Sequence, residues 1–108
     1  MRGGELDRRV TLLYATTEPN GLGEEVETWR TLATVWASYS PTSDGERVRA
    51  AEVAAVIEAR FRIRWSRSLT ALTPKNRLRF EGREFNIIGV KEIGRREGLE
   101  ISAAARAE

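Results

Sequence analysis

Apolar and polar residues alternate with period two along much of the chain, which predicts strands with one buried face. The longest alternation covers residues 55–66, where the apolar positions are Ala55, Ile57, Ala59, Phe61, Ile63 and Trp65 and the polar ones are Glu58, Arg60, Arg62, Arg64 and Ser66. At ~3.3 Å per residue this strand would be over about 30 Å long, about twice the usual length. We therefore expect it to bend across both halves of a barrel or to project from one.

The remaining strands are shorter. Residues 8–14, 77–90 and 99–105 are typical of strands, and residues 26–41 predict one short and one full strand. Glu81 and Gly82 fit a two-residue hairpin turn, and counting outward places Leu78 opposite Phe85 and Arg79 opposite Glu84. The Pro-, Asn- and Gly-containing residues 15–25 predict a turn, and residues 91–98 a polar connection.

One short helix is expected over residues 44–53. Ser43 and Glu46 have the spacing of a capping box, in which each side chain binds the other residue's backbone N–H. The apolar face of this helix consists mostly of alanine, so we expect it to pack weakly. Several strands with a single helix and no alternating βα units predict one domain over residues 1–108, mainly β, with the architecture of a small antiparallel barrel or sandwich.

Composition narrows the chemistry further. The 108 residues include no cysteine and no histidine, so disulfides, common zinc sites, cysteine nucleophiles and histidine bases are excluded, and we expect no metal, no cofactor and no enzyme activity. The 18 Lys and Arg against 16 Asp and Glu give a net charge of only +2, which does not by itself indicate nucleic-acid binding. No apolar run is long enough for a signal peptide or membrane span, which predicts a cytoplasmic protein without membrane contact.

Five arginines form a candidate basic face on the predicted strands: Arg60, Arg62, Arg64, Arg77 and Arg79. They fit a solvated or salt-bridged sheet face, an arginine-rich protein interface, or a surface that binds nucleic-acid phosphates. Nearby carboxylates such as Glu58, Glu84 and Glu100, and the absence of aromatic residues on the predicted arginine side, favour the first interpretation over the third.

Two other groups of residues are candidate sites by their chemistry. Glu24, Glu25 and Glu27 follow a glycine-rich turn, where water would keep them ionised, so a solvated loop is favoured over an acid–base or metal site. The three tryptophans, Trp29, Trp36 and Trp65, are expected to be core or interface aromatics rather than ligand-stacking residues.

In order along the chain, "LDRRVTLL", "NGLGEEVETW", "LATVWASYSP", "EARFRIRW", "LTPKNRLRFEGREFNIIGV" and "GLEISA" resemble the head-tail joining (head closure, or stopper) proteins of tailed bacteriophages. The likeness covers nearly the whole chain. It implies a six-stranded β-barrel with one short helix and long loops, in a structural protein that forms a ring around the DNA channel. The family includes proteins of phage-derived particles such as gene transfer agents.

The resemblance also implies partners and a location. These are other copies of the chain in a ring, a portal or adaptor protein, a tail terminator or tail tube protein, and DNA that passes through without sequence-specific binding. The protein would belong to a virion or phage-like particle and to the bacterial host cytoplasm during assembly. The family's channel-facing or ring-facing connection corresponds to residues 42–54, with candidate residues Thr42, Asp44, Glu46, Arg47, Arg49 and Glu52. The alternative from another class is an oligonucleotide-binding barrel that uses Arg60, Arg62 and Arg64.

Overall fold

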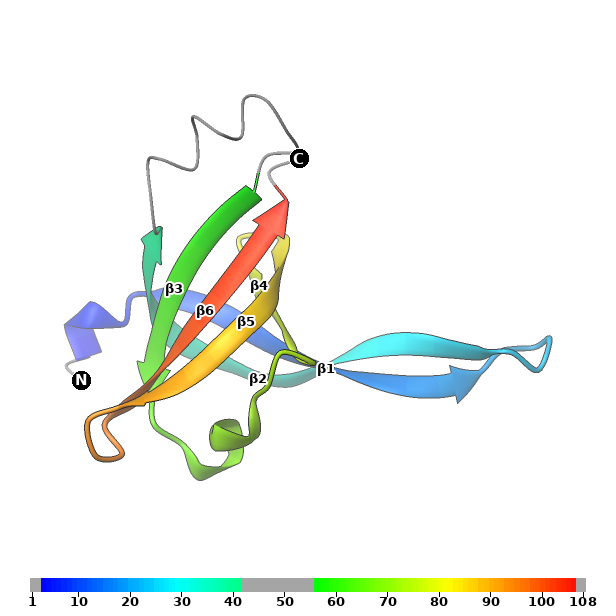
Figure 1. The fold of residues 1–108 in the computed structure, drawn as a ribbon, viewed down its shortest axis with the longest axis horizontal. Helices are drawn as coiled ribbons and strands as arrows, with labels where there is room; N and C mark the ends of the chain where they lie inside the picture. Colours follow the sequence, from blue (N-terminus) through cyan, green and yellow to red (C-terminus); the bar gives the residue numbers. More distant parts are fainter. Residues whose placement is uncertain (1–2, 42–55, 107–108) are drawn as a thin grey trace.

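The computed structural model describes residues 3–41 and 56–106 and shows a six-stranded barrel from which one hairpin projects (Figure 1). The strands are β1 (Arg8–Pro19), β2 (Glu25–Pro41), β3 (Val56–Arg64), β4 (Arg77–Phe80), β5 (Arg83–Ile93) and β6 (Gly98–Arg106). They close in the order β1-β2-β3-β6-β5-β4, and each neighbouring pair is antiparallel. The predicted mainly β, antiparallel six-stranded barrel is therefore confirmed. Two short 3₁₀ turns, η1 (Gly3–Glu5) and η2 (Arg67–Ala71), complete the described elements.

The barrel interior holds an aliphatic core around a cluster of aromatic rings. Phe61 is fully buried, and its ring centroid lies 5.3 Å from that of Phe80 and 5.4 Å from that of Phe85, both in edge-on geometry. Tyr39 joins the cluster, 4.8 Å from Phe80. Edge-on contacts at such distances are favourable for the aromatic quadrupole, so these rings fix how the strands close.

The β4–β5 hairpin has the predicted turn and register. Leu78 pairs with Phe85 and Arg79 with Glu84. Glu81 and Gly82 both have positive φ, 51° and 77°, as a two-residue turn of the type that matches strand twist requires. Leu78 and Phe85 are buried while Arg79 and Glu84 face solvent, which confirms the predicted sides.

The first two strands are longer than predicted. β1 does not end at residue 14 but continues to Pro19, and β2 is one continuous strand from Glu25, not a short and a full strand. Their pairing extends to Pro19 opposite Glu25, so the predicted turn over residues 15–25 shrinks to residues 20–24. We call the projecting part of this hairpin, residues 14–31, the arm.

The alternating strand around residues 56–64 is shorter than predicted. β3 has nine residues, pairs with β6 over its whole length and with β2 from Ala59 to Ile63. The prediction that this long strand might project was wrong; β1 and β2 project instead. β5 also continues to Ile93, so the predicted polar connection over residues 91–98 is a short turn at residues 94–97. The helix predicted over residues 44–53 lies outside the described residues.

Candidate functional site

The outer face of β3 places three of the predicted arginines together. Arg60, Arg62 and Arg64 are exposed, whereas Phe61 and Ile63 between them are buried, as the alternation predicts. Ile57 and Trp65, which the same pattern predicts to be buried, are only half-buried because they lie near the ends of the strand. β3 therefore presents a short row of cations to the outside of the barrel.

Arg62 in this row is joined to a buried carboxylate. Its Nε lies 2.9 Å from Glu100 Oε2 on the paired strand β6, and Lys91 Nζ on β5 lies 3.5 Å from Glu100 Oε1. Glu100 is only 5 % exposed. Burial alone would raise the pKa of this carboxyl, but the Arg62 hydrogen bond and the charges of Lys91, Arg62 and Arg60 together lower it below its usual value.

Arg77 and Arg79 belong to a different wall of the barrel. They lie on β4, which is three strands away from β3 in either direction around the closed ring. Arg79 Nη2 lies 3.4 Å from Glu84 Oε1, and the Arg77 guanidinium lies 4.2 Å from the ring centre of Trp29. The five arginines therefore do not form one continuous face, although several make the local contacts of a salt-bridged surface.

Each tryptophan is partly exposed and has an arginine over its ring. Arg9 lies 4.7 Å from the ring centre of Trp36, and Arg96 lies 5.2 Å from that of Trp65, in addition to Arg77 over Trp29. Trp36 is 51 % exposed. The expectation that no aromatic residue accompanies the arginine side was wrong, because Trp36 and Arg64 line the same depression on the barrel surface.

The arm is the feature that sequence reasoning missed. It exposes the apolar side chains of Tyr14, Leu22 and Val26. Within the described residues, β1 pairs with β4 only up to Leu13 and β2 pairs with β3 only from Ala37 onward, so both outer edges of the arm lack a strand partner. Unpaired strand edges and exposed apolar side chains together are typical of a surface that another chain covers.

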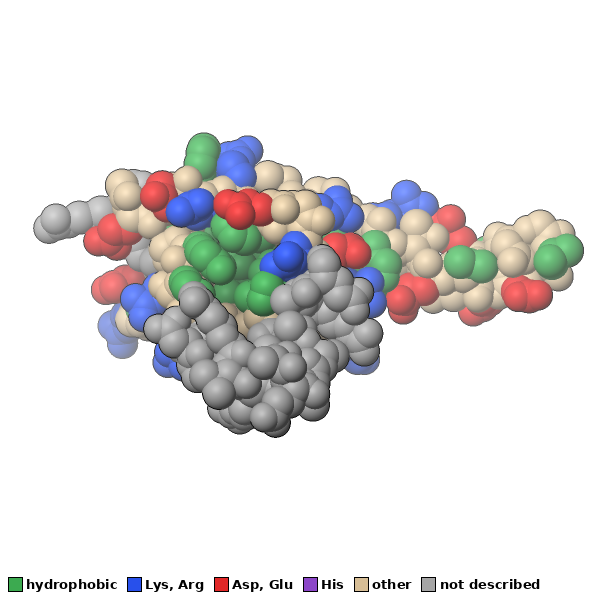
Figure 2. Space-filling model, turned by 90° about the horizontal axis from the view of Figure 1, so that it is seen from above, with side chains coloured by type: hydrophobic (Ala, Val, Ile, Leu, Met, Phe, Trp, Pro, Cys, Tyr) green, Lys and Arg blue, Asp and Glu red, His purple; other side chains and the backbone are tan. Residues whose placement is uncertain are grey.

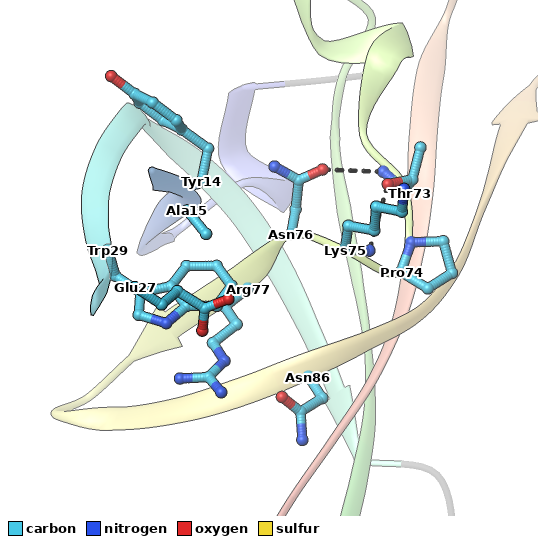
Figure 3. A pocket seen from close by; sticks show the side chains of 10 residues that line it. All are labelled: Tyr14, Ala15, Glu27, Trp29, Thr73, Pro74, Lys75, Asn76, Arg77 and Asn86. Carbon is cyan, nitrogen blue, oxygen red and sulfur yellow. Dashed lines mark hydrogen bonds between the residues drawn. The ribbon is translucent and has the colours of Figure 1, made fainter. Parts of the chain in front are cut away.

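The base of the arm is braced against the loop before β4 (Figure 3). Asn76 Nδ2 donates to the backbone carbonyl of Leu13 at 3.1 Å, and its Oδ1 accepts the Thr73 backbone N–H at 3.0 Å. Arg77 lies over Trp29 beside a depression of about 600 Å³ that also includes Lys75. These contacts set the direction in which the arm leaves the barrel.

The predicted acidic group lies on this arm, partly in its turn and partly in a strand. Glu24 is at the tip, and Glu25 and Glu27 are in β2, all exposed as expected for solvated carboxylates. Among residues 3–41 and 56–106, no cluster of His, Cys, Asp and Glu has the composition of a metal site. The candidate channel residues Thr42, Asp44, Glu46, Arg47, Arg49 and Glu52 lie outside the described residues.

In the part of the chain that the structure describes, no helix has the length and apolar character needed to cross a membrane. The features that do stand out are a closed barrel, a braced arm with two open edges, and arginine–tryptophan pairs on the surface. They define a small β-barrel domain that carries a projecting hairpin with exposed apolar side chains.

Comparison with known proteins identifies the family of this chain and similar solved structures. The sequence model of the phage head completion protein family matches residues 1–106, so the chain belongs to this family. Protein SF1141 from Shigella flexneri 2a, solved in solution, is similar over 100 % of this chain and 99 % of its own, with 30 % identity and a TM-score of 0.71.

A second solved structure, from the virion of a native gene transfer agent particle, is 27 % identical and covers 94 % of this chain and 96 % of its own, with a TM-score of 0.68. No curated protein matches. The family and the virion match support a structural role at the head–tail region of a phage or phage-like particle.

Proposed function

We propose that this protein is a head closure, or stopper, component of the connector between head and tail. In this role, copies of the chain form a ring between the portal or adaptor protein and the tail terminator or tail tube protein. DNA passes through the ring without sequence-specific binding. Residues 42–54, with Thr42, Asp44, Glu46, Arg47, Arg49 and Glu52, are proposed to face the channel or the neighbouring ring.

The observation that carries this proposal is the arm. The buried hydrophobic residues of the described chain lie outside residues 14–31, so the arm contributes nothing to the barrel core, yet it exposes Leu22 at 84 % and Val26 at 45 %. A segment that is well paired but buries no core is stabilised further when a partner covers its apolar side chains and edges. A connector ring supplies such partners on both sides of each subunit.

A structural role also fits the chemistry of the chain. Without cysteine or histidine, catalysis would depend on carboxylates, lysine or tyrosine. The buried carboxylate of Glu100 is held ionised by Arg62 and Lys91, which suits an ion pair and not a general acid. We therefore propose a protein that is not an enzyme and needs no cofactor, assembled in the bacterial host cytoplasm and retained in the particle.

The test uses particle assembly. In cells that produce the particle, the chain is replaced by a version in which residues 17–27 are exchanged for an Asn-Gly turn, which leaves the paired residues Thr16 and Thr28 at its two ends. Electron micrographs should then show filled or emptied heads without tails and separate tails, whereas Ile88→Ser, at an exposed position away from the arm, should leave joined particles at the normal level. Joined particles at the normal level when the chain is deleted altogether would refute the proposal.

A second candidate function is nucleic-acid binding by the barrel itself, which Trp36 beside Arg9 and Arg64 favours. Binding through phosphate contacts would weaken steeply between low and physiological salt. A DNA titration of the purified protein distinguishes the two. The connector should show little affinity at physiological salt, and tight binding that Arg60→Ala, Arg62→Ala and Arg64→Ala together abolish would favour the second candidate.

A further inference from the structure

A notch opens in the barrel wall beside residues 33–36 of β2. β3 pairs with β2 only as far as Ile63 opposite Ala37. After β3 the chain turns toward the β5–β6 hairpin, because the Trp65 backbone N–H donates to the Glu97 carbonyl at 3.4 Å and its indole N–H to Glu92 Oε1 at 3.2 Å. Within the described residues, the edge of β2 at residues 33–36 is therefore left without a strand partner on this side.

The notch is apolar inside and cationic at its rim. It has a volume of about 400 Å³, and Leu6, Trp36, Trp65 and Leu69 are among its lining residues. Arg9 and Arg64 also line it, and no ion pair joins either guanidinium to a carboxylate of the described chain. Such a notch fits an apolar side chain that is flanked by carboxylates.

The arm tip has this composition. Leu22 is 84 % exposed and is followed by Glu24 and Glu25, neither of which takes part in an ion pair within the described residues. Figure 2 shows acidic side chains along the arm and apolar ones toward its end.

The tip is also held in one conformation. Asn20 Oδ1 accepts the backbone N–H groups of Leu22 at 2.8 Å and Glu24 at 3.0 Å. The Asn20 backbone N–H donates to the Glu24 carbonyl at 2.7 Å, and Gly23 adopts a positive φ of 82°. An exposed anchor that is already ordered loses little conformational entropy on binding.

We propose that Leu22 of one copy of the chain inserts into the notch of a second copy, with Glu24 and Glu25 beside Arg9 and Arg64. This inference rests on the proposed function, because it supplies the subunit contact of the ring. Trp36 lies eleven residue steps beyond Glu25 along β2, about 36 Å at ~3.3 Å per residue, so the tip cannot reach the notch of its own chain. The contact joins two different surfaces, which is the head-to-tail type that forms a ring when the rotation between successive copies closes.

A second copy explains both surfaces at once, whereas the other occupants explain only one. Nucleic acid would contact Arg9, Arg64 and the Trp36 ring but would be repelled by the acidic tip and would leave Leu22 exposed. A tail or adaptor protein that covers the tip would explain the exposed Leu22, but it would not explain the arginines at the rim of the notch. The matched charges of tip and notch on the same chain favour self-association.

The test exploits the absence of cysteine from the chain. Full-length Leu22→Cys protein is mixed with full-length Ser68→Cys protein, whose substituted position is exposed and lines the notch, under mild oxidation. Ile88→Cys, 55 % exposed on β5, replaces Leu22→Cys as the matched control. We expect the tip–notch disulfide to form on the order of tenfold faster than the control pair. Equal rates would overturn the inference.

Charge reversal provides the specificity test. Adding Arg9→Glu and Arg64→Glu to the notch partner should reduce cross-linking to the control rate, and adding Glu24→Arg and Glu25→Arg to the tip partner should restore it. A chain carrying both cysteines should give a ladder of products that ends in closed rings, and a product that stops at the dimer would overturn the head-to-tail contact. Binding of a short DNA duplex that requires Arg9 and Arg64, with cross-linking at the control rate, would also overturn it.

Particle assembly separates this inference from the proposed function. If the charge-reversed tip still yields joined particles while deletion of the chain does not, the connector role stands and the tip–notch contact is wrong. If deletion of the chain leaves joined particles, the connector role itself is wrong, whatever the cross-linking gives.

Discussion

Arg60, Arg62 and Arg64 offer a matched set for measuring what a buried carboxylate contributes to this barrel. They share one strand, one face and one side-chain type, but Arg62 is the one that contacts Glu100, at 2.9 Å. Substitution of each in turn by methionine removes the charge and keeps most of the aliphatic stem, so the three variants differ mainly in the lost ion pair.

The expected loss in the free energy of unfolding for Arg62→Met follows from the environment of Glu100. A hydrogen bond to a charged group contributes about 1.5–3 kcal/mol, and removing one partner leaves the desolvated group behind. Glu100 is 5 % exposed but retains Lys91 Nζ at 3.5 Å, so we expect the lower part of this range, about 1.5–2 kcal/mol, for Arg62→Met. Arg60→Met and Arg64→Met should each lie within about 0.5 kcal/mol of the native protein.

The assay is urea unfolding followed by tryptophan fluorescence at a series of pH values. Because the pKa of Glu100 is lowered in the folded state, its contribution is fully present above the ordinary carboxyl pKa and is lost as the pH falls through the folded pKa. The cost of Arg62→Met should therefore be constant near neutral pH and shrink in acid. Equal costs for the three variants, or a cost of Arg62→Met that does not change in acid, would refute this account of the pair.

Three further predictions concern the barrel and the arm. Phe61→Ala should lower the free energy of unfolding by about 3–5 kcal/mol, because it empties the centre of the aromatic cluster; Phe61→Leu, the control, should cost clearly less in the same urea titration. Gly94→Ala should cost about 1 kcal/mol or more by thermal unfolding, since φ is +61° and the new Cβ would lie 2.7 Å from Glu97 Cδ; an unchanged midpoint would contradict it. Hydrogen exchange of the free protein should be faster in residues 14–31 than in β3 and β6, because the arm contributes no core residue; equal protection would count against an arm that needs a partner.

The part of the fold that the sequence predicts well is the part with one buried face. Phe61 and Ile63 alternate with arginines because β3 has a core on one side and water on the other, and this asymmetry produces the periodic signal. The Glu81-Gly82 turn is also predicted well, because a positive φ at both positions limits which residues fit. These elements were predicted with the correct register and sides.

The sequence does not predict the arm because the arm has no buried face and therefore no periodic pattern. Both faces of residues 14–19 are mostly exposed, so Thr16, Thr17 and Glu18 show no alternation, and Pro19 and Asn20 look like the start of a loop. Pro19 is tolerated at the end of a strand whose outer edge pairs with no strand of the described residues. The signal for a strand here is the pair of consecutive β-branched residues Thr16 and Thr17, which lie opposite Thr28 and Glu27 and are compatible with a two-stranded ribbon.

The candidate site depends on contacts between distant segments, which periodicity does not report. Arg77 over Trp29 and the Asn76 contact with Leu13 follow from closure of the barrel, in which β4 pairs with β1. Arg9 lies over Trp36 because these two residues are opposite each other in the β1–β2 register. The same closure places β3 and β4 on opposite walls, which separates Arg77 and Arg79 from the other arginines.

The register shift between Leu12 and Leu13 of β1 marks the place where barrel pairing gives way to the arm. Beyond it, no residue of the arm has to match a core position, so its length is not fixed by the barrel. Adding two residues to each strand would extend the reach by about 7 Å and keep every side chain on its original face, because side chains alternate with period two. In the proposed ring, the length of this hairpin can therefore change with the spacing between neighbouring subunits without any change in the barrel that carries it.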